Sequence, residues 1–346
     1  MKRSREAGAI DQAYPRSMPR NEELRVRAGD ATLAGTITLP NDPPPPDRRG
    51  RYPNVLLLPS WLPRDRDGLF DRVRHADWFA PEPMPAPGLL GRLADALARQ
   101  GVASLRCDPR GSAASDGEWE LVSLFTRIDD ARDMLAAIRS HGALDLRRSG
   151  IVGHGEGATA AISVAVGDPA LSAVLLIGAP ARSPRDVLRR AVAERARTGI
   201  DLQHPIVAAL DWASEEMVER AERREASAQV WLRGGHPLEV SLAGLEQAMH
   251  TPNLALASML HRNVTLAHGA RDVWVAPGEA ELLAGVLREG GNQPELRLVP
   301  AAGHDLAEAD DGVIEALALS LAASIGPREL PPVLIALEEM DAGSLQ

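Results

Sequence analysis

The stretch GIVGHGEGATAAISVAV, residues 150–166, decides the fold class of this chain. It begins with a short apolar run, continues through a turn with glycines at every second position (Gly153, Gly155 and Gly157), and ends in an alanine-rich run. Closely spaced glycines permit a sharp turn and let a helix pack close to a strand. The stretch therefore predicts a buried strand, a tight turn and a helix that follows directly.

The same alternation of strands and helices continues on both sides of this stretch. We expect strands at 54–58, 102–106, 150–153, 171–177, 264–267 and 295–299, and helices at 89–100, 123–141, 156–166, 277–289 and 311–325. Ahead of them, 24–27 and 32–39 have the alternation of a β-hairpin. Strands that alternate with helices form parallel sheets covered on both faces. The sequence predicts an α/β fold with a mostly parallel sheet of eight strands.

Composition changes along the chain predict its organisation. Residues 1–20 are polar and aperiodic and are expected to form a disordered tail, residues 21–179 and 263–326 form the α/β core, and 327–346 form a C-terminal extension with a short helix at Val333–Leu337. The remaining segment, 180–262, is charged, has helical periodicity and shows no convincing strand. Because it interrupts two sheet strands, we expect it to form a helical cap over their carboxyl ends.

Charge and cysteine content exclude several classes of protein. The 346 residues carry a net charge of −10, which argues against a nucleic-acid partner. A single cysteine, Cys107, excludes internal disulfides and a cysteine-rich zinc site. No apolar stretch approaches the roughly 20 residues of a membrane span, and the N-terminus lacks the apolar region of a secretion signal. We therefore expect a cytoplasmic protein without a membrane partner, metal or cofactor, and leave a homodimer open.

Polar residues follow three of the predicted strands. The turn at 153–157 has the strand–turn–helix setting of a nucleophile elbow, G-x-S-x-G. Asp272 follows the strand at 264–267, and His304 follows the strand at 295–299. The order elbow, Asp, His is the order in which α/β-hydrolases carry their catalytic residues. The pattern predicts that these three positions meet at one edge of the sheet.

With these motifs the chain resembles the α/β-hydrolase superfamily, in particular the serine-aminopeptidase-like (S33-type) esterases. Members carry an oxyanion loop like HGSGPQDRDG, a segment like LAxxLAxxGxxxLRxDxRGxGxSxG and an elbow like GHSEG. The corresponding segments here are Pro63 with 65–68 (DRDG) and 93–117 (LADALARQGVASLRCDPRGSAASDG). The resemblance spans about residues 24–325 and implies the α/β-hydrolase fold, with Asp272 and His304 as orienting acid and base.

Three departures from the family pattern affect the chemistry. Gly155 occupies the position of the nucleophilic serine, and Pro59-Ser60 replaces the His-Gly that precedes the oxyanion loop. The next residues, Trp61 and Leu62, are bulky where small residues are usual. Acyl-enzyme catalysis needs a nucleophile, a base and amide donors for the oxyanion. The sequence lacks the first and alters the third, but retains candidates for the base and its orienting acid.

We therefore predict general acid/base catalysis by His304, oriented by Asp272, without a covalent intermediate. Elimination, cyclisation, isomerisation or direct hydrolysis of a carbonyl or ester compound would fit, for example in secondary metabolism. The cap together with Trp61 and Leu62 favours a bulky, partly apolar small molecule as the substrate.

At the elbow, the amides of Glu156 and of Trp61 or Leu62 are the predicted donors to the substrate oxygen. A ligand or water is expected in the space beside Gly155.

Two other functions stay open on the sequence alone. One is an ordinary serine carboxylesterase or thioesterase whose serine has been changed to glycine for crystallography, and the other is a non-catalytic small-molecule-binding pseudohydrolase. His154 is expected to support the elbow structurally. Of the remaining hydroxyls, Ser60, Ser112 and Ser115 do not lie on the elbow, and Ser60 is the first candidate for a nucleophile. Ser60 and His154 also belong to the predicted oxyanion and substrate-binding region, with Trp61, Leu62 and Glu156. Asp108, Arg110 and the DRDG carboxylates are expected to form an ion network, and Cys107 to pack at a strand end.

Overall fold

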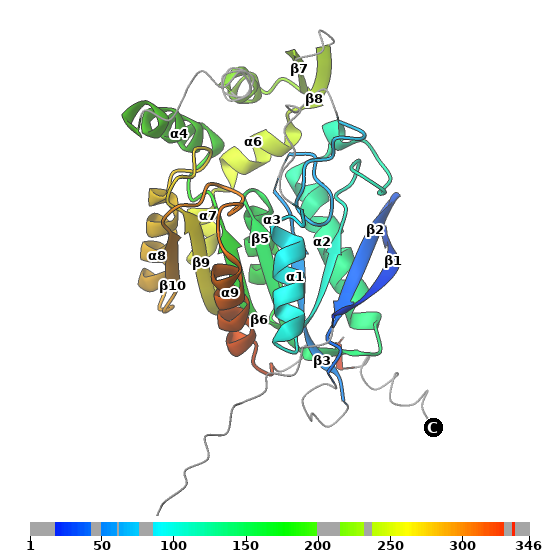
Figure 1. The fold of residues 1–346 in the computed structure, drawn as a ribbon. Coiled ribbons are helices and arrows are strands. Elements are labelled where there is room, and N and C mark those ends of the chain that lie inside the picture. Colours follow the sequence, from blue (N-terminus) through cyan, green and yellow to red (C-terminus); the bar gives the residue numbers. More distant parts are fainter. Residues whose placement is uncertain are drawn as a thin grey trace, which may run out of the picture.

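The computed structural model describes residues 18–42, 50–60, 62–75, 86–198, 215–231, 237–328 and 334–335. Its main sheet contains β1 (Arg20–Ala28), β2 (Ala31–Leu39), β3 (Tyr52–Leu58), β4 (Ala103–Cys107), β5 (Leu144–His154), β6 (Leu171–Ile177), β9 (Asn263–Gly269) and β10 (Glu295–Val299). These strands are ordered β1-β2-β4-β3-β5-β6-β9-β10 (Figure 1). The strands from β4 to β10 are parallel, whereas β2 is antiparallel to both of its neighbours. The predicted mostly parallel, eight-stranded sheet is confirmed.

Helices cover both faces of this sheet. They are α1 (Leu89–Arg99), α2 (Leu124–Ser140), α3 (Gly157–Gly167), α8 (Gly278–Glu289) and α9 (Asp311–Ser324), with a short 3₁₀ helix, η2 (Trp119–Leu121). On β3, Leu56 and Leu58 pack in the core with α2, α3 and α8, whereas Val55 and Leu57 pack in the core with α1 and α9. Because side chains alternate along a strand, apolar runs fill both cores.

The predicted helix ends have local causes. Ser123 caps α2, because its side chain accepts a hydrogen bond of 3.0 Å from the Thr126 amide. Asp310 caps α9 in the same way through the Val313 amide, also at 3.0 Å. Beyond the end of α1, Gly101 adopts a φ of +76°, a conformation that glycine takes without a steric penalty.

The insertion between β6 and β9 contains both helices and strands. It comprises α4 (Pro184–Thr198), a helical segment at 215–222, the antiparallel pair β7 (Ser227–Trp231) and β8 (Pro237–Ser241), α6 (Ala243–His250) and α7 (Asn253–Ala257). The expectation that this segment has no strand is therefore wrong. Each strand has five residues, too short for a clear alternation in sequence, and the pair is stabilised by tertiary packing: Ala228 and Val240 bury against Trp119 of η2.

The insertion lies over the end of the sheet at which β5 leads into α3 (Figure 1). Within it, α6 packs against α2 and α4, and α7 packs against α3 and α8. The described residues thus cover the carboxyl ends of the strands, where the predicted site lies.

Both chain ends differ in part from the sequence-based boundaries. The predicted tail, 1–20, extends too far, because Arg20 already pairs with Leu39 in the β1–β2 ladder. Most of that tail and the proline-rich residues 43–49 lie outside the described residues. Of the predicted helix at Val333–Leu337 only 334–335 are described, and Leu334 packs with Leu146 and Ala170.

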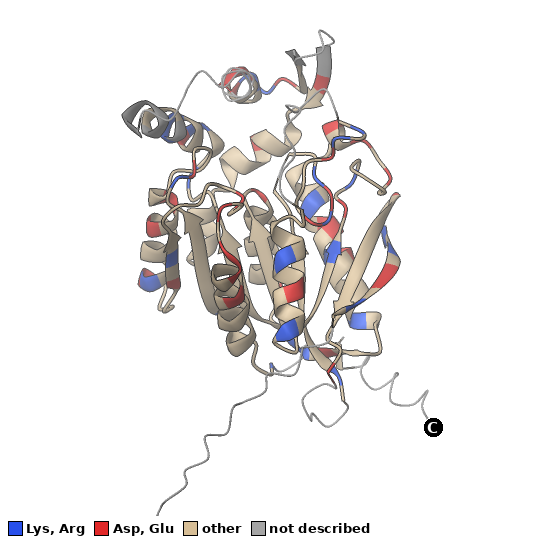
Figure 2. Cartoon of the chain, in the orientation of Figure 1, with Lys and Arg blue, Asp and Glu red and all other residues tan. Residues whose placement is uncertain are grey.

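Charged residues gather on helices, loops and the outer strand β1, while the inner strands carry few (Figure 2). Largely buried ion pairs tie the loops beside the site to one another, to β4 and to α2: Arg66 with Asp108 at 2.8 Å, Arg106 with Asp67 at 2.6 Å, and Arg110 with Asp130 at 2.7 Å. The predicted ion network is present.

Cys107 is buried at the end of β4, as expected, and burial raises the pKa of its thiol to about 12. No helix in the described ranges has the length and apolarity needed to span a bilayer.

Replacing Asp108 should test how strongly this network holds the loops. Asp108 accepts hydrogen bonds from the backbone and the guanidinium of Arg66 and from the Ala114 amide. We expect Asp108→Asn to lower the free energy of unfolding by about 2–3 kcal/mol in urea titrations, because Arg66 loses its buried ion-pair partner and keeps only the exposed carboxylate of Glu23. Asp129→Asn is the matched control: its pair with Arg132 is exposed, so a change below about 0.5 kcal/mol is expected. Equal losses in both variants would contradict this role.

Candidate active site

The loops after β9 and β10 bring an acid and a base together. His304 Nδ1 lies 2.7 Å from Asp272 Oδ2, and both side chains are largely buried. The predicted meeting of Asp272 and His304 is confirmed. The other carboxylate oxygen, Oδ1, accepts hydrogen bonds of 2.8 Å from the amides of Trp274 and Val275. The carboxylate is therefore held in place, and it orients the imidazole of His304.

His268 is a further member of this cluster that the sequence analysis did not place in the site. Its Nε2 lies 3.2 Å from Asp272 Oδ2 and donates a 2.8 Å hydrogen bond to the Val275 carbonyl. The side chain is fully buried. The available sequence signal was its position near the end of a predicted strand, four residues before Asp272.

Asp272 and His304 each favour the charged form of the other. Burial alone would raise the pKa of Asp272, but the charge of His304 and hydrogen bonds from His268 and His304 hold it well below its ordinary value. Burial lowers the pKa of His304, and the Asp272 carboxylate outweighs this effect, so the pKa of His304 is raised. Asp272 therefore remains ionised and strengthens His304 as a base.

His154, beside the elbow, is held neutral. Burial and the charge of His304 lower its pKa to about 3. Its ring centroid lies 4.7 Å from that of His304, and its Nε2 donates a 3.1 Å hydrogen bond to the His304 carbonyl. These contacts support the loop that carries His304.

The turn from β5 into α3 has the sharp geometry that the glycines predict. Gly155 has a φ of +56°. A Cβ at Gly157 would lie only 2.3 Å from the Pro59 carbonyl oxygen, so the start of α3 approaches the end of β3 as closely as a glycine allows.

Ser60 takes the space that the missing side chain of residue 155 leaves. A Cβ built on Gly155 would lie 2.2 Å from Ser60 Oγ and 2.9 Å from His304 Nε2. Ser60 therefore fills the beginning of the space in which a ligand or water was expected. The pairing of the strands explains this contact. β3 and β5 are parallel neighbours with Leu58 opposite Gly153, so Ser60 and Gly155, each two residues further along the chain, lie opposite one another.

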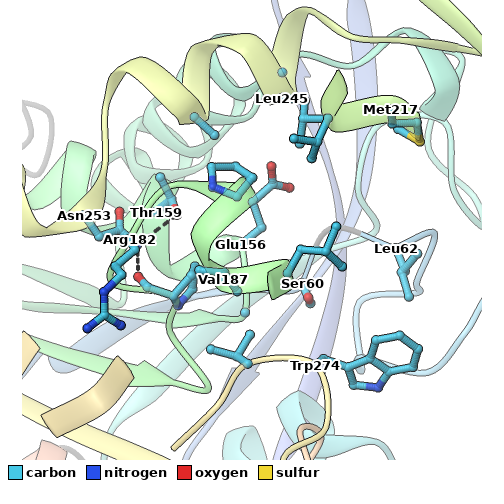
Figure 3. A pocket seen from close by; sticks show the side chains of 18 of the residues that line it. Ser60, Leu62, Glu156, Thr159, Arg182, Val187, Met217, Leu245, Asn253 and Trp274 are labelled. Atoms are coloured by element: carbon cyan, nitrogen blue, oxygen red, sulfur yellow. Dashed lines mark hydrogen bonds between the residues drawn. The ribbon is translucent and has the colours of Figure 1, made fainter. Parts of the chain in front are cut away.

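These groups open onto a cavity of about 260 Å³ between the core and the insertion. Ser60, Glu156 and His304 line this cavity together with apolar residues of the insertion: Val187, Leu188, Met217, Val218, Leu245 and Ala248. Figure 3 shows Met217 and Leu245 on the side of the cavity away from Ser60. Leu62 also lines the cavity, whereas Trp61 lies outside the described residues.

Two charged residues of the cavity lining have distinct surroundings. Burial raises the pKa of Glu156, whose Oε2 has no hydrogen-bond partner among the described residues and lies 3.7 Å from Arg127.

Arg64, which the sequence analysis did not single out, is 2% exposed, pairs with Asp305 at 2.9 Å and lies over the Phe70 ring at 4.2 Å. It joins the loop after β3 to the loop that carries His304. Its position between Pro63 and the DRDG motif was the available sequence signal.

The described part of the chain holds no group of three or more His, Cys, Asp or Glu side chains arranged to bind a metal ion. The ring nitrogen of His268 that faces Asp272, Nε2, donates its proton to the Val275 carbonyl and so is not available as a metal ligand.

Comparisons with solved structures identify the fold. Est1E from Butyrivibrio proteoclasticus, with ferulic acid bound, aligns over 87% of this chain and 99% of its own at 14% identity and a TM-score of 0.60. The esterase domain of a Rhodothermus marinus protein aligns over 89% and 100% at 19% identity and a TM-score of 0.56. The alpha/beta hydrolase GrgF from Penicillium sp. sh18 aligns over 88% and 99% at 17% identity and a TM-score of 0.58. These similarities show the α/β-hydrolase fold.

The family follows from the sequence. Residues 87–311 match the model of the serine aminopeptidase, S33 family. The chain belongs to this family of α/β-hydrolases. No protein of curated function matches the chain.

A side chain added at residue 155 should collide with Ser60. We expect Gly155→Ala to lower the free energy of unfolding by about 1–3 kcal/mol, because φ is positive and Ser60 Oγ occupies the place of the Cβ. In contrast, Gly285→Ala, in α8 with open space around it, should raise it by about 0.5–1 kcal/mol.

The same urea titrations with Ser60→Gly complete a double-mutant cycle. If the two side chains compete for one space, Ser60→Gly should recover part of the loss, giving a coupling of about 1 kcal/mol. Additive effects of the two substitutions would contradict the competition.

Proposed function

We propose that this chain is an enzyme that acts on a small carbonyl or ester compound through general acid/base catalysis by His304, oriented by Asp272. The observation that carries the proposal is the 2.7 Å hydrogen bond between them beside the cavity, with His304 Nε2 directed towards the elbow. No acyl-enzyme forms on residue 155, because glycine has no nucleophilic group.

His304 Nε2 would take a proton from a substrate O–H or C–H group, or from water, and return it to a leaving oxygen or carbon. Asp272 holds the opposite ring nitrogen and stabilises the imidazolium that forms. The Glu156 amide, at the start of α3, would donate to the substrate oxygen, where the helix dipole favours negative charge. Elimination, cyclisation, isomerisation and hydrolysis by activated water all fit this arrangement.

The size and lining of the cavity restrict the class of substrate that fits. Its volume of about 260 Å³ lies just below the usual range of ligand pockets, which supports a compact molecule in the space that the described residues enclose. Most of the lining residues are apolar, and His304 is one of the few ionisable residues among them. We infer a compact small molecule with an apolar part towards the insertion and a carbonyl or ester group at His304.

Two observations argue against the alternative functions, an esterase with a substituted serine and a non-catalytic binding protein. A simple esterase that lacks only its serine would have room for that serine, but Ser60 Oγ lies 2.2 Å from the Cβ position of residue 155. A binding protein without catalysis would not need the charge that Asp272 maintains beside His304. Both observations support an enzyme whose active site differs from the family pattern.

Removing the imidazole should abolish turnover. With p-nitrophenyl butyrate as the probe ester, we expect His304→Ala to lower kcat/KM by about 10²–10⁴-fold, the usual contribution of a general acid/base group. His261→Ala is the control, because His261 is exposed at the opposite end of β9 and should leave the rate unchanged. Near-normal turnover by His304→Ala would remove His304 from the mechanism.

The pH dependence should report the partner of His304. A base acts only when it is neutral, so kcat/KM should fall with decreasing pH as His304 is protonated, at a pKa above its ordinary value of 6.5. Asp272→Asn removes the charge that raises this pKa, so the acid limb should move to lower pH while the maximal rate drops. An acid limb that does not move in Asp272→Asn would show that another group controls it.

A further inference from the structure

We propose that Ser60 supplies the nucleophilic hydroxyl that residue 155 lacks, and that His304 is its base. A side chain on residue 155 would begin 2.2 Å from Ser60 Oγ and 2.9 Å from His304 Nε2. Both groups therefore lie within 3 Å of one point, the place at which a nucleophile on the elbow would begin. The inference rests on the proposed role of His304 and adds a covalent route to ester hydrolysis.

The sheet explains how a residue outside the elbow reaches this point. Ser60 follows β3 as Gly155 follows β5, and these parallel strands pair with Leu58 opposite Gly153. The close approach of Gly157 to the Pro59 carbonyl brings the two loops together. Serine at 60 and glycine at 155 are complementary, because two side chains cannot share the space. One hydroxymethyl group thus occupies it, carried by the loop after β3.

The environment of Ser60 suits a reactive hydroxyl. Its side chain lines the cavity together with His304, and its Oγ makes no hydrogen bond with another described residue, so the contact between Ser60 Oγ and His304 Nε2 would form when substrate binds. Other hydroxyls are engaged or lie elsewhere: Thr159 Oγ1 accepts a hydrogen bond from Asn253, and Ser115 Oγ donates to the Asp108 carbonyl. Ser112 is fully buried outside the cavity lining.

The reaction would proceed in two balanced steps. In the first, Ser60 Oγ bonds to the ester carbonyl carbon while its proton passes to His304 Nε2, and the oxyanion faces the Glu156 amide. The carbon–oxygen bond to the leaving group then breaks, and the departing oxygen takes the proton from His304. In the second, water attacks the acyl-Ser60 ester and gives a proton to His304, which returns it to Ser60 Oγ as the acid leaves. The sum is ester plus water giving acid plus alcohol.

A fluorophosphonate probe tests this proposal without knowledge of the substrate. Ser60 Oγ would bond to phosphorus, fluoride would leave, and the serine proton would pass to His304. We expect intact-mass spectra of the full chain to show one adduct and peptide mapping to place it on Ser60. Ser60→Ala should abolish the adduct, whereas Ser112→Ala should label at the wild-type rate.

Two further variants separate the two proposals. His304→Ala should slow labelling of Ser60 at least 100-fold, and the exchanged pair Ser60→Gly with Gly155→Ser should carry the label on residue 155. Circular dichroism would confirm that each variant is folded.

Absence of labelling, or labelling at another residue, would overturn the role of Ser60. If His304→Ala still loses turnover, the proposed function would stand without Ser60. Labelling of Ser60 at an unchanged rate in His304→Ala would instead remove His304 as the base.

Discussion

The site depends on the close contact between the turn that ends β5 and the end of β3. A Cβ at Gly153 would lie 2.4 Å from Ala158, and one at Gly157 would lie 2.3 Å from the Pro59 carbonyl oxygen. Only glycines permit this approach, which presses the start of α3 onto the neighbouring strand. Because the loops are in contact here, a side chain on one of them determines which side chain the other can carry.

The acid/base pair depends on a second set of contacts. Asp272 is held by two backbone amides and by His268, and His304 is supported from behind by His154. The Arg64–Asp305 pair joins the loop after β3 to the loop of His304, so the hydroxyl of Ser60 and the imidazole are positioned by linked elements. Buried charges of this kind are tolerated because each is paired.

Much of the fold and part of the site could be predicted from local sequence patterns. Apolar strand runs and capping residues such as Ser123 give the α/β order, because these signals act within a few residues. Glycine spacing gives the elbow, and the order of motifs gives the pairing of Asp272 with His304. The β7–β8 pair could not be predicted, since its strands are stabilised by burial against η2 rather than by their own pattern.

The sequence by itself determined the sheet, the sharp turn at residue 155 and the two loops that carry Asp272 and His304. Only the tertiary structure decided what lies beside them. Ser60 and Gly155 are 95 residues apart in the chain, and their competition for one space appears only when β3 and β5 pair in register. Packing between distant segments also placed His268 and Arg64 around the pair. The physical reason is that steric exclusion and burial depend on neighbours in space, which a local sequence pattern does not contain.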